Sequence, residues 1–150
     1  MNTKTSSDKT PMNTKIIKVL VEKHDDGSYW GSTQNLPGVI AGQGETLEEL
    51  KKSLKIAFDD YIDLARLTKK AWAANYTNPA EWSWEYEMNI QSFFDLIPEV
   101  KISLIGKKSG INQSLMRQYA TGKAPASEAR LKKIEATIHE LGRELLSVHF

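Results

Sequence analysis

Cysteine is absent from the 150 residues of the chain. Without thiols the protein can form neither disulfide bonds nor thiolate metal sites, and it has no cysteine nucleophile. The absence also suits a reducing compartment, so we expect a cytoplasmic location. Histidine is scarce as well, and the three residues are isolated from one another: His24, His139 and His149. We therefore expect no metal ion and no other cofactor.

Long hydrophobic runs are also missing. No apolar stretch approaches the ~20 residues that a membrane-spanning helix requires, and the N-terminus lacks the apolar segment of a signal peptide. Residues 1–14 are mostly Lys, Thr, Ser, Asp and Asn without periodicity, so we expect a disordered tail there. The overall composition, with 40% hydrophobic and 26% charged residues, is that of a soluble globular protein with no membrane partner.

The net charge of +1 hides an uneven distribution. Residues 100–150 contain nine basic and four acidic residues, a net charge of +5, so residues 1–99 carry −4. A basic C-terminal part beside an acidic N-terminal part suggests two different partners. A chance imbalance on solvated faces is the alternative interpretation.

Residues 101–122 have the pattern of two short helices joined by a tight turn. Gly110 occupies the turn, where a positive φ favours glycine, and Asn112 follows it as a helix N-cap. Gly106, four residues before the turn, allows a second helix to approach closely. The apolar side chains expected to meet in one small core are Ile105, Ile111, Met116 and Tyr119.

The second helix of this pair would present polar side chains at its N-terminal end. The residues expected to face outward are Gln113, Ser114, Arg117 and Gln118. Short polar groups at the start of a helix suit the reading of base edges in a DNA groove. Lys107, Lys108 and Lys123 flank the segment and are expected to contact phosphates. An ordinary helical hairpin with a polar surface is the alternative.

With these residues the segment resembles the helix-turn-helix of the Cro/lambda-repressor (XRE) class. The matching features are Gly106, Gly110, the run Ile-Asn-Gln-Ser at 111–114, and Gly122 closing the second helix. The loop at 123–128 resembles the one that this class places before its next helix.

The N-terminal half has strand patterns followed by a helix pattern. Strands are expected over 16–21, over 29–33 after an Asp-Asp-Gly-Ser turn, and over 39–41. The first of these strands could be buried on both faces. Thr46 and Glu49 form a capping box before a helix that extends to about Leu67. Its apolar residues recur at helical spacing, which predicts an amphipathic helix packed on a sheet.

This β–β–β–α unit resembles the HicB-type antitoxin domain, a partial RNase H-like fold. The turn Leu36-Pro37-Gly38, together with Gly44 and Thr46-Leu-Glu-Glu49, carries the resemblance. We therefore expect an α+β protein with a disordered tail over 1–14, a HicB-like domain over 15–89, and an all-α helix-turn-helix domain over 90–150.

The segment between the two expected domains is rich in aromatic residues. Residues 81–88 alternate strictly and predict a further strand with a buried Trp/Tyr/Met face, although a nucleotide-stacking platform is the alternative for the aromatic cluster. Whether this strand completes the N-terminal sheet or bridges to the C-terminal module stays open. Helices are expected over 90–98 and after a Ser127 N-cap, and the tail at 146–150 alternates like a strand that could mediate a dimer contact.

Catalytic residues are not expected in this chain. Asp59 and Asp63 share a helical face that Asp60 does not fully join, but no histidine ligands or glycine-rich phosphate loop accompany them. We interpret them as a solvated acidic face. The HicB resemblance also implies the loss of the nuclease carboxylates.

The resemblance implies an antitoxin that binds and neutralises a HicA-type mRNA-cleaving toxin and represses its own operon through double-stranded operator DNA. It would act as a homodimer or a higher homo-oligomer. Toxin-binding residues are not predicted. A stand-alone helix-turn-helix regulator with an N-terminal sensor or dimerisation domain is the main alternative, and a nuclease with retained activity is another.

Overall fold

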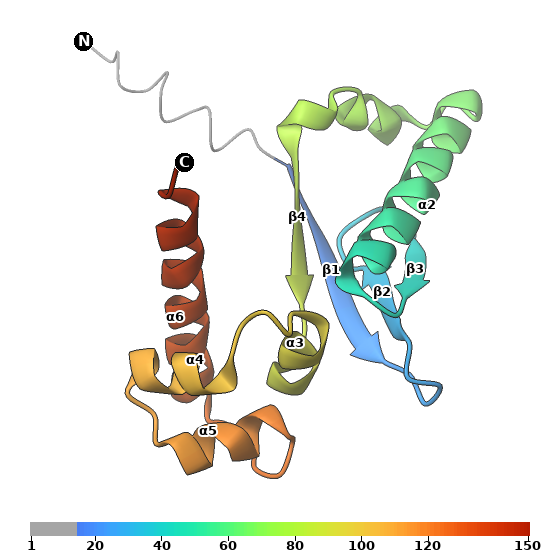
Figure 1. Cartoon of the computed structure of the whole chain (residues 1–150). Helices are drawn as coiled ribbons and strands as arrows, with labels where there is room; N and C mark the ends of the chain where they lie inside the picture. The colour runs from blue at the N-terminus through green and yellow to red at the C-terminus, as the bar shows by residue number, and fades with distance from the viewer. Residues whose placement is uncertain (1–14) are drawn as a thin grey trace. The chain divides into compact units, whose positions relative to one another are not determined.

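The computed structural model describes residues 15–150, so the tail predicted over 1–14 lies outside the described residues. The chain is α+β, as predicted, and forms two compact units. The first unit ends at Met88 and contains a sheet, and we call it the sheet unit. The second unit, Asn89–Phe150, is built from helices in the described chain, and we call it the helical unit (Figure 1).

Four strands make the mixed sheet of the sheet unit: β1 (Lys15–Lys23), β2 (Tyr29–Thr33), β3 (Ala41–Gly44) and β4 (Trp82–Glu87). Their order is β3-β2-β1-β4; β1 pairs antiparallel with β2 and parallel with β4, and β2 pairs antiparallel with β3. Ile17, Val19 and Val21 are buried, whereas on the other face Ile16 and Lys18 are exposed and Leu20 is partly buried. The prediction that β1 could be buried on both faces is therefore wrong, because only one face meets the core.

One long helix, α2 (Leu47–Leu67), covers the buried face of this sheet. Its predicted capping box is confirmed: Glu49 N donates to Thr46 Oγ1 at 3.1 Å, and Thr46 N donates to Glu49 Oε2 at 3.3 Å. The helix lies very close to β3, since a β carbon on Gly42 would come within 2.8 Å of the Leu54 backbone nitrogen. Bulkier residues in β3 would push α2 off the sheet. The third strand begins at Ala41, two residues later than predicted for its start.

The aromatic segment belongs to the core of the sheet unit. Two 3₁₀ turns, η1 (Ala71–Tyr76) and η2 (Pro79–Glu81), lead into β4. The buried Phe58 ring of α2 has edge contacts with Tyr76, Trp82 and Trp84 at centroid distances of 5.8, 4.9 and 5.3 Å. Because β4 pairs with β1, the predicted strand completes the N-terminal sheet. Its aromatic residues pack rather than form an open platform.

The helical unit consists of α3 (Ile90–Leu96), α4 (Ile102–Ser109), α5 (Gln113–Ala120) and α6 (Glu128–Leu146). Its buried cluster draws on all four helices and the α4–α5 turn: Phe94, Ile105, Ile111, Met116, Tyr119, Ala120 and Ile134. The N-cap predicted at Ser127 is confirmed, because its side chain accepts from Arg130 N at 3.2 Å.

The strand predicted over 146–150 is wrong. Helix α6 continues through Leu146, and the amide of Ser147 donates to the carbonyl of Arg143 at 3.2 Å. The apolar residues Ile134, Ile138 and Leu141 recur at helical spacing, and Leu145 continues the series. This longer helical pattern determines the structure, whereas the alternation covers only five residues. Residues 148–150 have no regular structure.

Candidate nucleic-acid interface

The turn between α4 and α5 has the geometry that its sequence predicts. Gly110 has a φ of +72°, in the left-handed region that glycine adopts without steric cost. The amide of Ile111 donates to the carbonyl of Gly106 at 3.0 Å and closes the end of α4. Asn112 then caps α5, since its Oδ1 accepts from Ser114 N at 2.9 Å and from Leu115 N at 3.3 Å. The direction of α5 is therefore fixed by backbone geometry.

Helices α4 and α5 cross at close range at Gly106. This glycine is buried, and a β carbon there would lie 3.3 Å from the Met116 Cβ and 3.2 Å from the Gln113 Oε1. The four apolar residues predicted to form one core do so. Tyr119 further connects α5 to α6, because Arg130 Nη1 donates to its hydroxyl at 3.0 Å. Helix α5 is thus supported along its inner face.

Gln113 does not face outward as predicted. Its side-chain amide donates to the Ser103 carbonyl of α4 at 3.0 Å. Its Oε1 is buried and has no hydrogen-bond partner in the described residues. The first residue of α5 is therefore a bridge between the two helices. The sequence gives no signal for this bridge, because the position depends on how closely Gly106 lets the helices approach.

Three of the four predicted residues do present exposed side chains on α5: Ser114, Arg117 and Gln118. The three flanking lysines, Lys107, Lys108 and Lys123, are exposed too. Lys108 differs, since its Nζ lies 3.1 Å from Glu144 Oε1 of α6 in an exposed ion pair. An ammonium that already has a carboxylate partner is less available to a phosphate than a free one.

The chain segment that forms α4 and α5 carries charge of one sign. Residues 100–127 contain five basic residues and no acidic one. Part of this charge borders an open hollow of about 360 Å³ at the N-terminal end of α4, whose polar lining is Lys101, Ser103 and Arg117. The N-cap residue of α4, Lys101, makes no side-chain capping bond, so amides of the first turn are left for an outside acceptor. Lys101 was not among the predicted site residues, although a lysine at a helix start is visible in the sequence.

Helix-start amides, two cations and a hydroxyl are groups that bind phosphate oxygens. With the exposed Ser114, Arg117 and Gln118 beside them, this surface combines phosphate contacts with groups able to pair with base edges.

The chain matches no protein-family model, no curated protein and no solved structure. Evidence for function therefore comes from the residues and their geometry. In residues 15–150 none of the helices is both long and apolar enough to span a membrane.

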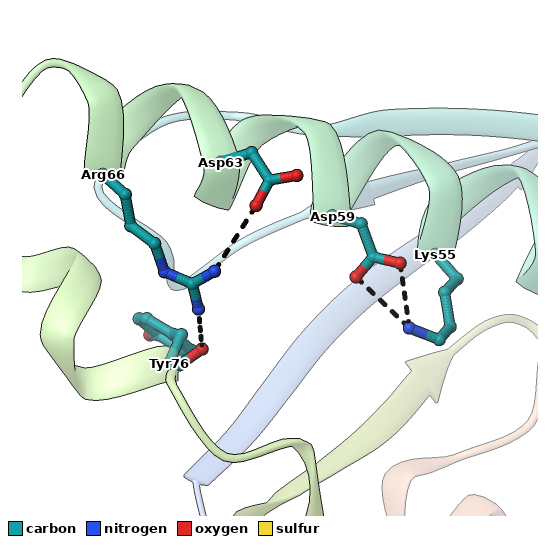
Figure 2. A network of polar contacts seen from close by, with 5 residues as sticks. All are labelled: Lys55, Asp59, Asp63, Arg66 and Tyr76. Atoms are coloured by element: carbon teal, nitrogen blue, oxygen red, sulfur yellow. Dashed lines mark hydrogen bonds and ion pairs between the residues drawn. The ribbon is translucent and has the colours of Figure 1, made fainter.

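Two carboxylates of α2 lie in local ion pairs (Figure 2). Asp59 pairs with Lys55 at 3.0 Å, and Asp63 pairs with Arg66 at 3.4 Å, while Arg66 Nη2 also donates to the Tyr76 carbonyl at 3.0 Å. Among the described residues no three potential metal ligands of the His, Cys, Asp and Glu type come together. The contacts of Asp59 and Asp63 are those of a solvated helix face with i,i+3 and i,i+4 pairs.

The lowered pKa of the Asp26 carboxyl has a local cause. Asp26 accepts from the Ser28 hydroxyl at 2.6 Å and from the Ser28 amide at 2.9 Å, and these bonds hold the pKa of the Asp26 carboxyl below its usual value. Burial raises the pKa of the Tyr76 and Tyr86 hydroxyls. Both effects follow from the β1–β2 turn and the aromatic core.

Proposed function

We propose that this protein is a sequence-specific DNA-binding antitoxin, in which α4, the Gly110 turn and α5 act as a helix-turn-helix. The observation that carries the proposal is the exposed polar side of α5, set within a stretch of residues 100–127 that has only basic charge. A rigid helix that offers short polar side chains amid cations is what reading a major groove requires.

In this proposal the exposed residues divide into two roles. Ser114, Arg117 and Gln118 contact base edges, with Gln118 suited to adenine and Arg117 to guanine. Lys101, Lys107 and Lys123 contact phosphates, which position the protein without specifying sequence. Gln113 holds α5 against α4, and Lys108 holds α6 through Glu144.

The antitoxin part of the proposal concerns the sheet unit. Three antiparallel strands are followed by a capped helix in this unit. The HicB-type domain that the sequence resembles has the same order of elements. Residues 15–88 hold twelve acidic and nine basic residues, a net charge of −3, which suits capture of a basic HicA-type ribonuclease because complementary charge speeds encounter. The protein itself would have no catalytic role.

DNA reading is tested by selecting duplexes from a random-sequence pool with the full chain. We expect enrichment of an inverted repeat, because each helix-turn-helix reads one half-site. Gln118→Ala should then cost about 1–3 kcal/mol on the selected duplex and little on a scrambled one. Lys107→Ala should weaken both duplexes alike and reduce the salt slope by about one.

Lys108→Ala is the matched control, because its ammonium is already paired with Glu144. We expect a smaller loss of DNA affinity than for Lys107→Ala. A pool that stays unenriched, or equal losses for Gln118→Ala on both duplexes, would show that α5 does not read bases.

Toxin capture is tested by co-expression with a HicA-type toxin. A fragment of residues 15–88 should restore growth, because the acidic charge and the HicB-like unit lie there. Rescue only by fragments containing the helical unit would contradict the assignment. A DNA-binding protein that rescues nothing would instead be the stand-alone regulator.

A further inference from the structure

The C-terminal half of α6 presents an apolar face that its own unit leaves uncovered. The N-terminal half packs inward, with Ile134 buried and Ile138 and Leu141 against the core cluster. The C-terminal end of the helix extends past α4 and α5 (Figure 1), and Leu145 and Leu146 are 65% and 81% exposed. Four of the exposed large hydrophobic residues of the described helical unit fall in the last six positions: Leu145, Leu146, Val148 and Phe150.

This half of α6 has a contact to its own unit on one side. The exposed ion pair between Glu144 and Lys108 joins it to α4 at 3.1 Å. The exposed leucines therefore belong to a regular helix with an open side. Contiguous exposed apolar residues of this kind mark interaction sites.

Gly142 lies on the same open side, one turn before Leu145 and Leu146 and three turns after the exposed Leu131. Glycine is the least favourable helix residue after proline. Within the helical unit nothing requires it here, because a β carbon at Gly142 would meet no atom within 4 Å. A missing side chain between leucines allows another helix backbone to come close.

The charge of α6 selects among possible occupants. Helix α6 has four basic and four acidic residues, whereas residues 100–127 have only basic ones. An electrically balanced helix is unsuited to nucleic acid or to a strongly charged protein, but two copies of it do not repel each other. The apolar residues recur at helical spacing, so the surface that matches them best is another helix with the same spacing.

We propose that the open face of α6, formed by Leu131, Gly142, Leu145 and Leu146, is a dimer interface with α6 of a second copy, and that the two helices cross at Gly142. The proposal does not depend on DNA or toxin binding. It replaces the strand pairing that the tail sequence predicted with helix–helix packing.

Sedimentation of the full chain from nanomolar to high micromolar concentration tests the interface. We expect a reversible monomer–dimer equilibrium. Leu146→Asp should raise the dimer dissociation constant at least about tenfold, because the free energy gained by burying one leucine side chain corresponds to a change of that size. Leu67→Asp is the matched control, since Leu67 of α2 is also 81% exposed, and it should leave the equilibrium unchanged.

Gly142→Ala gives the sharper test, because the two effects of the substitution have opposite signs. Alanine favours the helix, so the urea midpoint measured at monomeric concentration should rise. The added methyl group blocks the crossing, so the dimer dissociation constant should rise about tenfold or more. A tighter or unchanged dimer would overturn the crossing at Gly142.

A wild-type protein that stays monomeric at all concentrations would overturn the interface itself. Equal weakening by Leu67→Asp and Leu146→Asp would also overturn it.

Discussion

Gln113 shows how one residue changes role once the packing is known. From sequence it is the first polar side chain after an N-cap, which is a typical position for a base contact. In the structure its amide donates to the Ser103 carbonyl, and its Oε1 lies against the position where Gly106 would carry a β carbon. A glutamine placed between two helices stabilises their crossing angle instead of contacting a ligand.

We expect Gln113→Ala to lower the free energy of unfolding of the helical unit by about 0.5–1.5 kcal/mol, the usual net value of one lost hydrogen bond. Urea denaturation followed by far-ultraviolet circular dichroism measures this change. Gln118→Ala, an exposed position on the same helix, is the control and should stay within about 0.5 kcal/mol of the wild type. A stability equal to that of the control would mean that the bond to Ser103 contributes nothing.

Lys108 is a second residue whose sequence context misleads. Lysines 107 and 108 are adjacent and look equivalent as phosphate contacts. Only the fold brings Glu144, 36 residues away, to within 3.1 Å of one of them. Which of two neighbouring lysines has a partner depends on long-range packing, and no local pattern contains that information.

At the scale of the element, helix ends were the most predictable features. The Thr46–Glu49 box, the Asn112 and Ser127 caps and the positive φ of Gly110 all agree with the sequence, because each depends on groups within four residues of one another. The prediction for the tail of α6 is wrong because five alternating residues, taken alone, are equally compatible with a strand and with the end of a helix. The apolar residues at helical spacing that precede them decide between the two.

The capping box of α2 should have a measurable effect. We expect Thr46→Ala to destabilise the sheet unit by about 1 kcal/mol, because the amide of Glu49 loses its acceptor. Thr46→Ser keeps the hydroxyl and should recover most of that loss, as thermal or urea unfolding can show. Equal destabilisation by both substitutions would assign the effect to the lost methyl group instead.

At the scale of the whole molecule, the α+β class and the strand at 82–87 followed from periodicity. The pairing of β4 with β1 did not, since parallel pairing between residues more than sixty positions apart leaves no mark in either strand. Which face of β1 is buried could not be predicted either, because its run of apolar residues places apolar side chains on both faces.

Each unit has its own buried cluster, one around Phe58 and one around Ile105 and Met116. Two separate cores allow two separate unfolding transitions, and a destabilising substitution should then act on the transition of its own unit.

The aromatic core has a practical consequence for such measurements. All four tryptophans of the chain, Trp30, Trp72, Trp82 and Trp84, lie in the sheet unit. Intrinsic tryptophan fluorescence of the unmodified protein is therefore an optical signal from one unit alone. Thr46→Ala should shift the fluorescence transition in urea to lower concentration, and Gln113→Ala should leave that transition in place while changing the dichroism. If Gln113→Ala shifts the fluorescence midpoint as well, the two units melt as one.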